Sequence, residues 1–114
     1  LTGTTTPERI YIIGAHYDHL EGDRPGGDDN ASGTAVVMEA ACRLAAGKAR
    51  PKKHHIVVGL WGAEEDGLLG SAHFVDSKLI DISNAVAYLN LDMVGHWRES
   101  LTVTSTGSNP PTSA

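Results

Sequence analysis

Basic residues, cysteine and long apolar runs are scarce in this sequence. The single cysteine, Cys42, cannot form an internal disulfide, and its alanine-rich surroundings indicate a small residue of the core. No apolar run approaches the roughly twenty residues of a membrane-spanning helix, and the opening residues lack the pattern of a signal peptide. Because 14 acidic residues outnumber 9 basic ones, we expect no nucleic-acid partner and no membrane span.

The chain has enough length and apolar content to form a buried core. Its 114 residues are 40% hydrophobic, which is typical of one globular domain. The net charge of -5 favours metal cations over phosphate groups as ligands. The sequence begins at Leu1 rather than at methionine. We therefore expect residues 1–114 to be a single, partial domain of a longer protein.

Apolar runs and helical patterns alternate along the chain. Short β-branched runs predict strands, and apolar residues at three-to-four-residue spacing predict helices with one apolar face, here including Val36 and Val37. The predicted strands cover residues 9–15, 54–61, 85–95 and 100–107, and the predicted helices cover residues 32–46 and 67–78. This order predicts a three-layer α/β/α sandwich with a mostly parallel central sheet.

Acidic residues follow each of the three main predicted strands. Ligands of such sheets bind beyond the carboxyl ends of the strands, so these residues are expected to meet at one edge. The candidates are His16, Asp18, Asp28, Asp29, Glu64, Glu65 and Asp92. Converging carboxylates repel one another unless they are protonated or bind a cation. One imidazole among carboxylates is a donor set that suits zinc. Manganese or cobalt would suit it less well, and calcium normally takes oxygen ligands alone.

The loop between the first strand and the first helix is rich in glycine, in the segment GAHYDHLEGDRPGGDDNASG. Its glycines allow the chain to turn back, which would bring His16 and Asp28 together. In an extended segment, His16 and Asp18 lie on the same side, so Asp18 could accept the spare imidazole proton and orient the ring. Asp18 need not contact the metal itself.

Each of these residues also has a purely structural interpretation. Asp28, Asp29 and Asn30 precede a helix and could cap it. Glu64 and Glu65 could be solvated turn residues. Asp92 directly follows an apolar run, where a charge must be paired. Solvent exposure or packing is the better interpretation for His54, His55 and His73, whereas the roles of His19 and His96 stay open.

Four segments in order, GAHYDH, GGDDNASG, LWGAEEDGLLGS and LNLDMVG, resemble the M28 family of co-catalytic zinc peptidases, chiefly aminopeptidases. The resemblance implies that His16 and Asp92 bind one zinc, Asp28 bridges two zinc ions and Glu65 binds the second. It further implies that Glu64 is the general base, that Asp18 supports His16, and that the substrate is a peptide. Many members of the family are secreted or periplasmic.

The resemblance also implies a second-zinc histidine well downstream of Asp92, and the sequence ends at Ala114 before such a residue. We therefore expect weak occupancy of the second site in this stretch, unless His96, water or another chain supplies the ligand. Two other functions remain open. One is a non-catalytic or inactive module of the same fold, and the other is a carboxypeptidase or glutaminyl cyclase reaction. Neither specificity nor oligomeric state follows from the sequence.

Overall fold

A computed structural model of the chain describes residues 1–3, 9–47, 54–96 and 102–104. Within these residues, three strands form one sheet: β1 (Ile10–His16), β2 (His55–Trp61) and β3 (Ala85–Asn90). Their order is β2-β1-β3, and both neighbours run parallel to β1. The first strand in sequence is thus central, and its carboxyl end, His16, pairs with Trp61 of β2.

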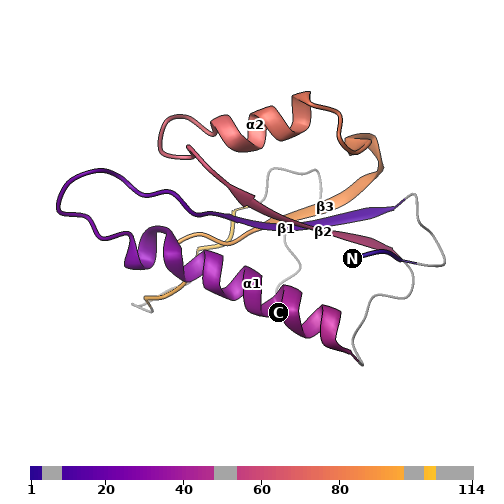
Figure 1. Ribbon diagram of the computed structural model, residues 1–114, viewed down its shortest axis with the longest axis horizontal. Coiled ribbons are helices and arrows are strands. Elements are labelled where there is room, and N and C mark those ends of the chain that lie inside the picture. The colour runs from indigo at the N-terminus through magenta and orange to yellow at the C-terminus, as the bar shows by residue number, and fades with distance from the viewer. Residues whose placement is uncertain (4–8, 48–53, 97–101, 105–114) are drawn as a thin grey trace.

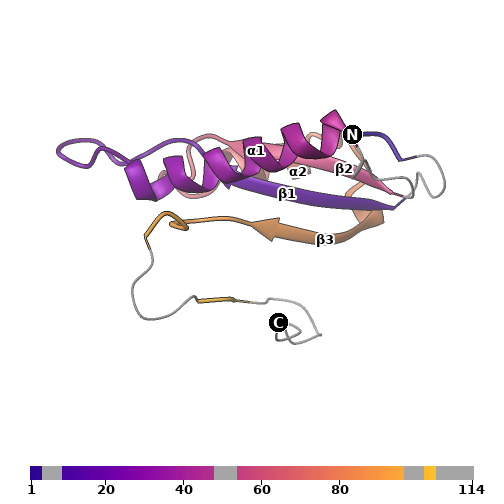
Figure 2. The ribbon, with the colours of Figure 1, turned by 90° about the horizontal axis from the view of Figure 1, so that it is seen from below.

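The two longer helices of the described residues lie on opposite faces of the sheet (Figures 1 and 2). They are α1 (Gly33–Ala46) and α2 (Leu69–Asp76), and neither is long and apolar enough to cross a bilayer. Short helical turns precede α1 and β3, namely η1 (Gly27–Ser32) and η2 (Ile82–Asn84). The parallel α/β arrangement expected from the sequence is therefore confirmed.

The two predicted helices and the first three predicted strands are observed, and most of them are shorter than predicted. The predicted helix over residues 67–78 is reduced to α2, and the predicted strand over 85–95 ends at Asn90. Beyond Asn90 the backbone turns away because the amides of Met93 and Gly95 donate to side chains next to α1 instead of to a strand. Residues 102–104 are not in a strand, and the rest of the predicted strand over 100–107 lies outside the described residues.

The core lies on both faces of the central strand β1, because α1 packs on β1 from one side and Ile12 borders an apolar cavity lined by Phe74 and Val75 on the side of α2. Ile10 and Ile12 of β1 are buried, and Val37 of α1 is completely enclosed. The buried apolar face of α1 is narrower than the sequence predicted, since Val36 is 47% exposed. Successive residues lie about 100° apart around a helix, so Val36 turns away from β1 when Val37 faces it. The prediction of a buried Cys42 is wrong for the same reason, and its thiol is exposed.

Candidate metal centre

The site begins with His16, the last residue of the central strand. Its side chain is only 2% exposed, because neighbouring elements enclose the carboxyl end of β1. The Nδ1 atom lies 3.1 Å from the backbone oxygen of Asp18. A carbonyl oxygen can only accept, so this hydrogen bond places the proton on Nδ1 and leaves a lone pair on Nε2. The ring is thereby oriented as a ligand.

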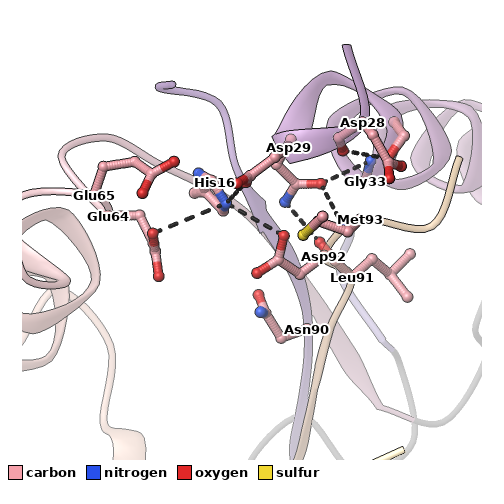
Figure 3. Close-up of polar contacts among 12 residues, drawn as sticks. His16, Asp28, Asp29, Gly33, Glu64, Glu65, Asn90, Leu91, Asp92 and Met93 are labelled. Atoms are coloured by element: carbon pink, nitrogen blue, oxygen red, sulfur yellow. Dashed lines mark hydrogen bonds and ion pairs between the residues drawn. The ribbon is translucent and has the colours of Figure 1, made fainter. Parts of the chain in front are cut away.

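Carboxylates from three different loops converge on the Nε2 atom of His16 (Figure 3). Asp29 Oδ1 lies 3.2 Å away and Asp92 Oδ1 lies 3.4 Å away. Glu64 Oε2 is slightly farther, at 4.0 Å. Parallel strands bring these loops to one edge, as the sequence predicted. Burial alone would lower the pKa of His16, but the negative charges of Asp92, Glu64 and Asp29 outweigh it and raise that pKa.

The spacing of three of these groups fits a metal ion. His16, Asp29 and Asp92 each offer a ligand atom, and these atoms all lie within 4.8 Å of one another. Ligand atoms bound tetrahedrally about 2.0–2.2 Å from a zinc ion would lie roughly 3.3–3.6 Å apart. The two observed separations from Nε2, 3.2 and 3.4 Å, are close to this range. The set of one imidazole and two carboxylates is also one that zinc accepts.

Glu65 gives a second indication of a cation site. Its Oε1 atom is buried and has no hydrogen-bond partner among the described residues. Burial, followed by the charges of Asp29 and Glu64, raises the pKa of Glu65. A buried carboxylate oxygen without a partner is costly. A cation between Glu65 and Asp29 would remove both the desolvation cost and the repulsion.

The two adjacent aspartates of the glycine-rich loop point in different directions (Figure 3). Asp29 faces His16, whereas the carboxylate of Asp28 accepts hydrogen bonds from the Gly95 amide at 2.9 Å and from the Ser32 hydroxyl at 3.2 Å. The backbone is non-helical at Asp29 and Asn30, and this separates the two side chains. The structure therefore places Asp29, and not Asp28, beside His16. The sequence offered both residues and no periodicity that distinguishes them.

Asp18 connects the site to the loop after β2. Its two carboxylate oxygens accept hydrogen bonds from the backbone amides of Glu64, at 3.1 Å, and Glu65, at 3.2 Å. Burial would raise the pKa of Asp18, but these two hydrogen bonds lower it. The carboxylate lies 3.6 Å from His16 Nδ1, so the predicted proximity is present. The direct hydrogen bond of Nδ1 is donated to the backbone oxygen of Asp18 instead.

Among the described residues, no histidine other than His16 belongs to this group of candidate ligands. His55 begins β2 at the opposite end of the sheet, and His73 lies in α2. The Nδ1 atom of His19 contacts the backbone oxygen of Leu20 at 2.8 Å. Asn30, which the sequence suggests only as a possible cap, is 1% exposed and donates a hydrogen bond to the segment around Asp92. Only its position after two aspartates could have drawn attention to it.

Comparison with known proteins agrees with this geometry. The family model described as "Peptidase family M28" matches residues 1–113. The chain belongs to peptidase family M28. The resemblance expected from its four ordered segments is thus confirmed, and the fit of His16, Asp29 and Asp92 to one ion agrees with a metallopeptidase family.

Several relatives are about 40% identical to this chain over the aligned residues. A "Probable zinc metalloprotease" of Pyrenophora tritici-repentis is 40% identical over 101 residues, which are 82% of this chain and 20% of the relative. An "Aminopeptidase" of Pseudomonas aeruginosa is 43% identical over 91 residues, 78% of this chain and 16% of the relative. A "Probable lipoprotein aminopeptidase LpqL" of Mycobacterium tuberculosis is 39% identical over 94 residues, 82% of this chain and 18% of the relative. The chain therefore spans about a fifth of the length of these relatives.

Proposed function

We propose that the protein is a zinc-dependent aminopeptidase and that this chain carries its metal centre and its general base. The observation that carries the proposal is the convergence of Asp29 and Asp92 on the Nε2 lone pair of the buried His16. This arrangement places one imidazole and two carboxylates, a donor set that zinc accepts, within reach of one ion. The names of the relatives, zinc metalloprotease and aminopeptidase, support the same reaction.

His16 and Asp92 would hold the first zinc ion, with Asp29 in the bridging position that the sequence analysis gave to Asp28. Glu65 would bind the second ion, for which its unpartnered buried oxygen is the support. His96, water or another chain would complete that second site. Zinc would supply Lewis acidity, because it polarises the scissile carbonyl and lowers the pKa of the attacking water.

Glu64 is the proposed general base. Its carboxylate reaches to 4.0 Å from His16 Nε2 and is 31% exposed, so it can contact a water molecule beside the metal centre as well as a substrate. Glu64 would accept a proton from the attacking water and return it to the departing amine, which leaves as a neutral group. Adjacent Glu65 can bind metal at the same time because Asp18 fixes the backbone of both residues.

A peptide is the proposed substrate. An open cavity of about 340 Å³ borders the metal centre and is lined in part by Asp29 and Glu65. This size is in the range of small-ligand sites, about 300–1,000 Å³. We also propose that the complete domain is a three-layer α/β/α sandwich. The lipoprotein relative supports an extracytoplasmic location.

The test is hydrolysis of a leucine chromogenic amide by the full-length protein, with and without zinc. We expect zinc-dependent turnover that falls by about 10²- to 10⁴-fold in Glu64→Gln, the range for loss of a general base, while the zinc content stays unchanged. Glu39→Gln is the matched control, since Glu39 is an exposed glutamate of α1 paired with Arg43. Full activity of Glu64→Gln would contradict the assignment of the base.

Product analysis separates the remaining reactions. A peptide with a free N-terminus and an N-acetylated copy should differ, because only the free peptide should lose its first residue. Release of a C-terminal residue would indicate a carboxypeptidase. Cyclisation of an N-terminal glutamine without cleavage would indicate a glutaminyl cyclase. Absence of every product from a zinc-loaded protein would favour a non-catalytic module.

A further inference from the structure

Asn30 is a buried polar residue without a role in the chemistry described so far. It directly follows Asp29, and its side chain is 1% exposed. Its Nδ2 atom donates to the backbone oxygen of Leu91 at 2.9 Å. Its Oδ1 atom accepts from the amides of Gly33 at 3.0 Å and Met93 at 3.3 Å. Three of the four hydrogen bonds that an amide side chain can make are therefore formed.

These hydrogen bonds join the two loops that carry the carboxylates of the metal centre. Leu91 and Met93 are the immediate neighbours of Asp92, while Asn30 is the immediate neighbour of Asp29. The bonds span 61 and 63 residues of sequence. No other side chain of the described residues is hydrogen-bonded to both neighbours of Asp92.

We propose that Asn30 is a positioning residue that holds Asp29 and Asp92 at the separation required to share one metal ion, an inference that rests on the proposed metal centre. The amide is suited to this task because it donates to one side of Asp92 and accepts from the other. Aspartate at this position offers no donor to Leu91, and alanine offers neither group. The fit is also tight, since a Cβ on Gly33 would lie 2.4 Å from Asn30 Oδ1.

The test measures zinc affinity in the full-length protein by competition with a chromogenic chelator. Asn30→Ala should bind zinc about 10- to 100-fold more weakly, the usual effect of removing a group that orients metal ligands. Val37→Ala is the control for general destabilisation, because Val37 is fully buried in α1 away from the ligands. At a temperature where circular dichroism shows both variants folded, Val37→Ala should keep the affinity of the unchanged protein.

A second measurement does not depend on metal. In a crystal structure of metal-free Asn30→Ala, Asp29 and Asp92 should lie farther from His16 Nε2 than the present 3.2 and 3.4 Å. If Asn30→Ala does not fold, Asn30→Asp, which keeps the volume and the acceptor, takes its place in both measurements. Unchanged affinity or unchanged distances would overturn the role of Asn30. Failure of the unchanged protein to bind zinc would overturn the proposed function instead, and the crystal distances would still decide the role of Asn30.

Discussion

Asp18 and Glu64 are joined across 46 residues of sequence, because Asp18 Oδ1 accepts a hydrogen bond from the backbone amide of Glu64 at 3.1 Å. The other oxygen of the same carboxylate accepts from the amide of Glu65. Asp18 also follows His16 by two residues and supplies the backbone oxygen that orients its ring. One residue thereby fixes the direction of the proposed ligand His16 and the position of the proposed base.

Replacement of Asp18 by asparagine should reduce turnover without removing the metal. The new NH₂ group would face one of the two amides that Asp18 now accepts from, so the loop carrying Glu64 would shift. We expect kcat to fall by about 10- to 100-fold, as is typical for a group that supports a metal site. Steady-state kinetics combined with metal analysis checks this. An unchanged kcat would show that the hydrogen bonds from the amides of Glu64 and Glu65 to Asp18 are dispensable.

The adjacent aspartates provide a matched pair of variants. Asp29→Asn should lose zinc because its carboxylate faces His16 Nε2. Asp28→Asn should keep zinc, since the amide oxygen of asparagine can still accept from Gly95 and Ser32. Elemental analysis of both purified variants measures the difference. Loss of zinc from Asp28→Asn together with retention in Asp29→Asn would instead support Asp28 as the ligand, as the family resemblance implies.

Removal of the metal should destabilise the folded protein. Without a cation, Asp29, Glu64, Glu65 and Asp92 repel one another, and the buried oxygen of Glu65 has no partner. Binding at 100 times the dissociation constant stabilises a folded protein by about 2.7 kcal/mol. Thermal unfolding with a chelator should therefore show a lower midpoint, and added zinc should restore it. A midpoint that changes with neither the chelator nor added zinc would argue against a metal centre.

Two glycines close to the site should respond differently to alanine. A Cβ on Gly33 would lie 2.3 Å from the backbone oxygen of Leu91, whereas a Cβ on Gly27 would meet nothing within 4 Å. Gly33→Ala must push α1 away from the segment before Asp92, at a cost of roughly 1–3 kcal/mol. Gly27→Ala should leave the free energy of unfolding almost unchanged. Denaturant unfolding of both variants tests the contact, and equal stabilities would contradict it.

The order of the elements and most residues of the candidate site could be predicted from the sequence. Apolar runs of β-branched residues have few alternatives to buried strands, and parallel strands must bring their carboxyl ends to one edge. His16, Glu64, Glu65 and Asp92 follow from this rule alone, because each stands where a strand ends or shortly after it. The hydrophobic pattern can be read from the local order of residues, and the topology of the sheet follows from the order of the strands and helices.

Which neighbouring side chain turns inward was decided only by the tertiary structure. Asp28 and Asp29 are chemically identical, and the hydrogen bonds of Asn30 and Asp28 to residues 91–95 select the one that faces His16. The exposure of Val36 and Cys42 depends likewise on how α1 is rotated over β1. Contacts between segments far apart in the sequence decide which side chains face inward, and a local sequence pattern does not predict such contacts.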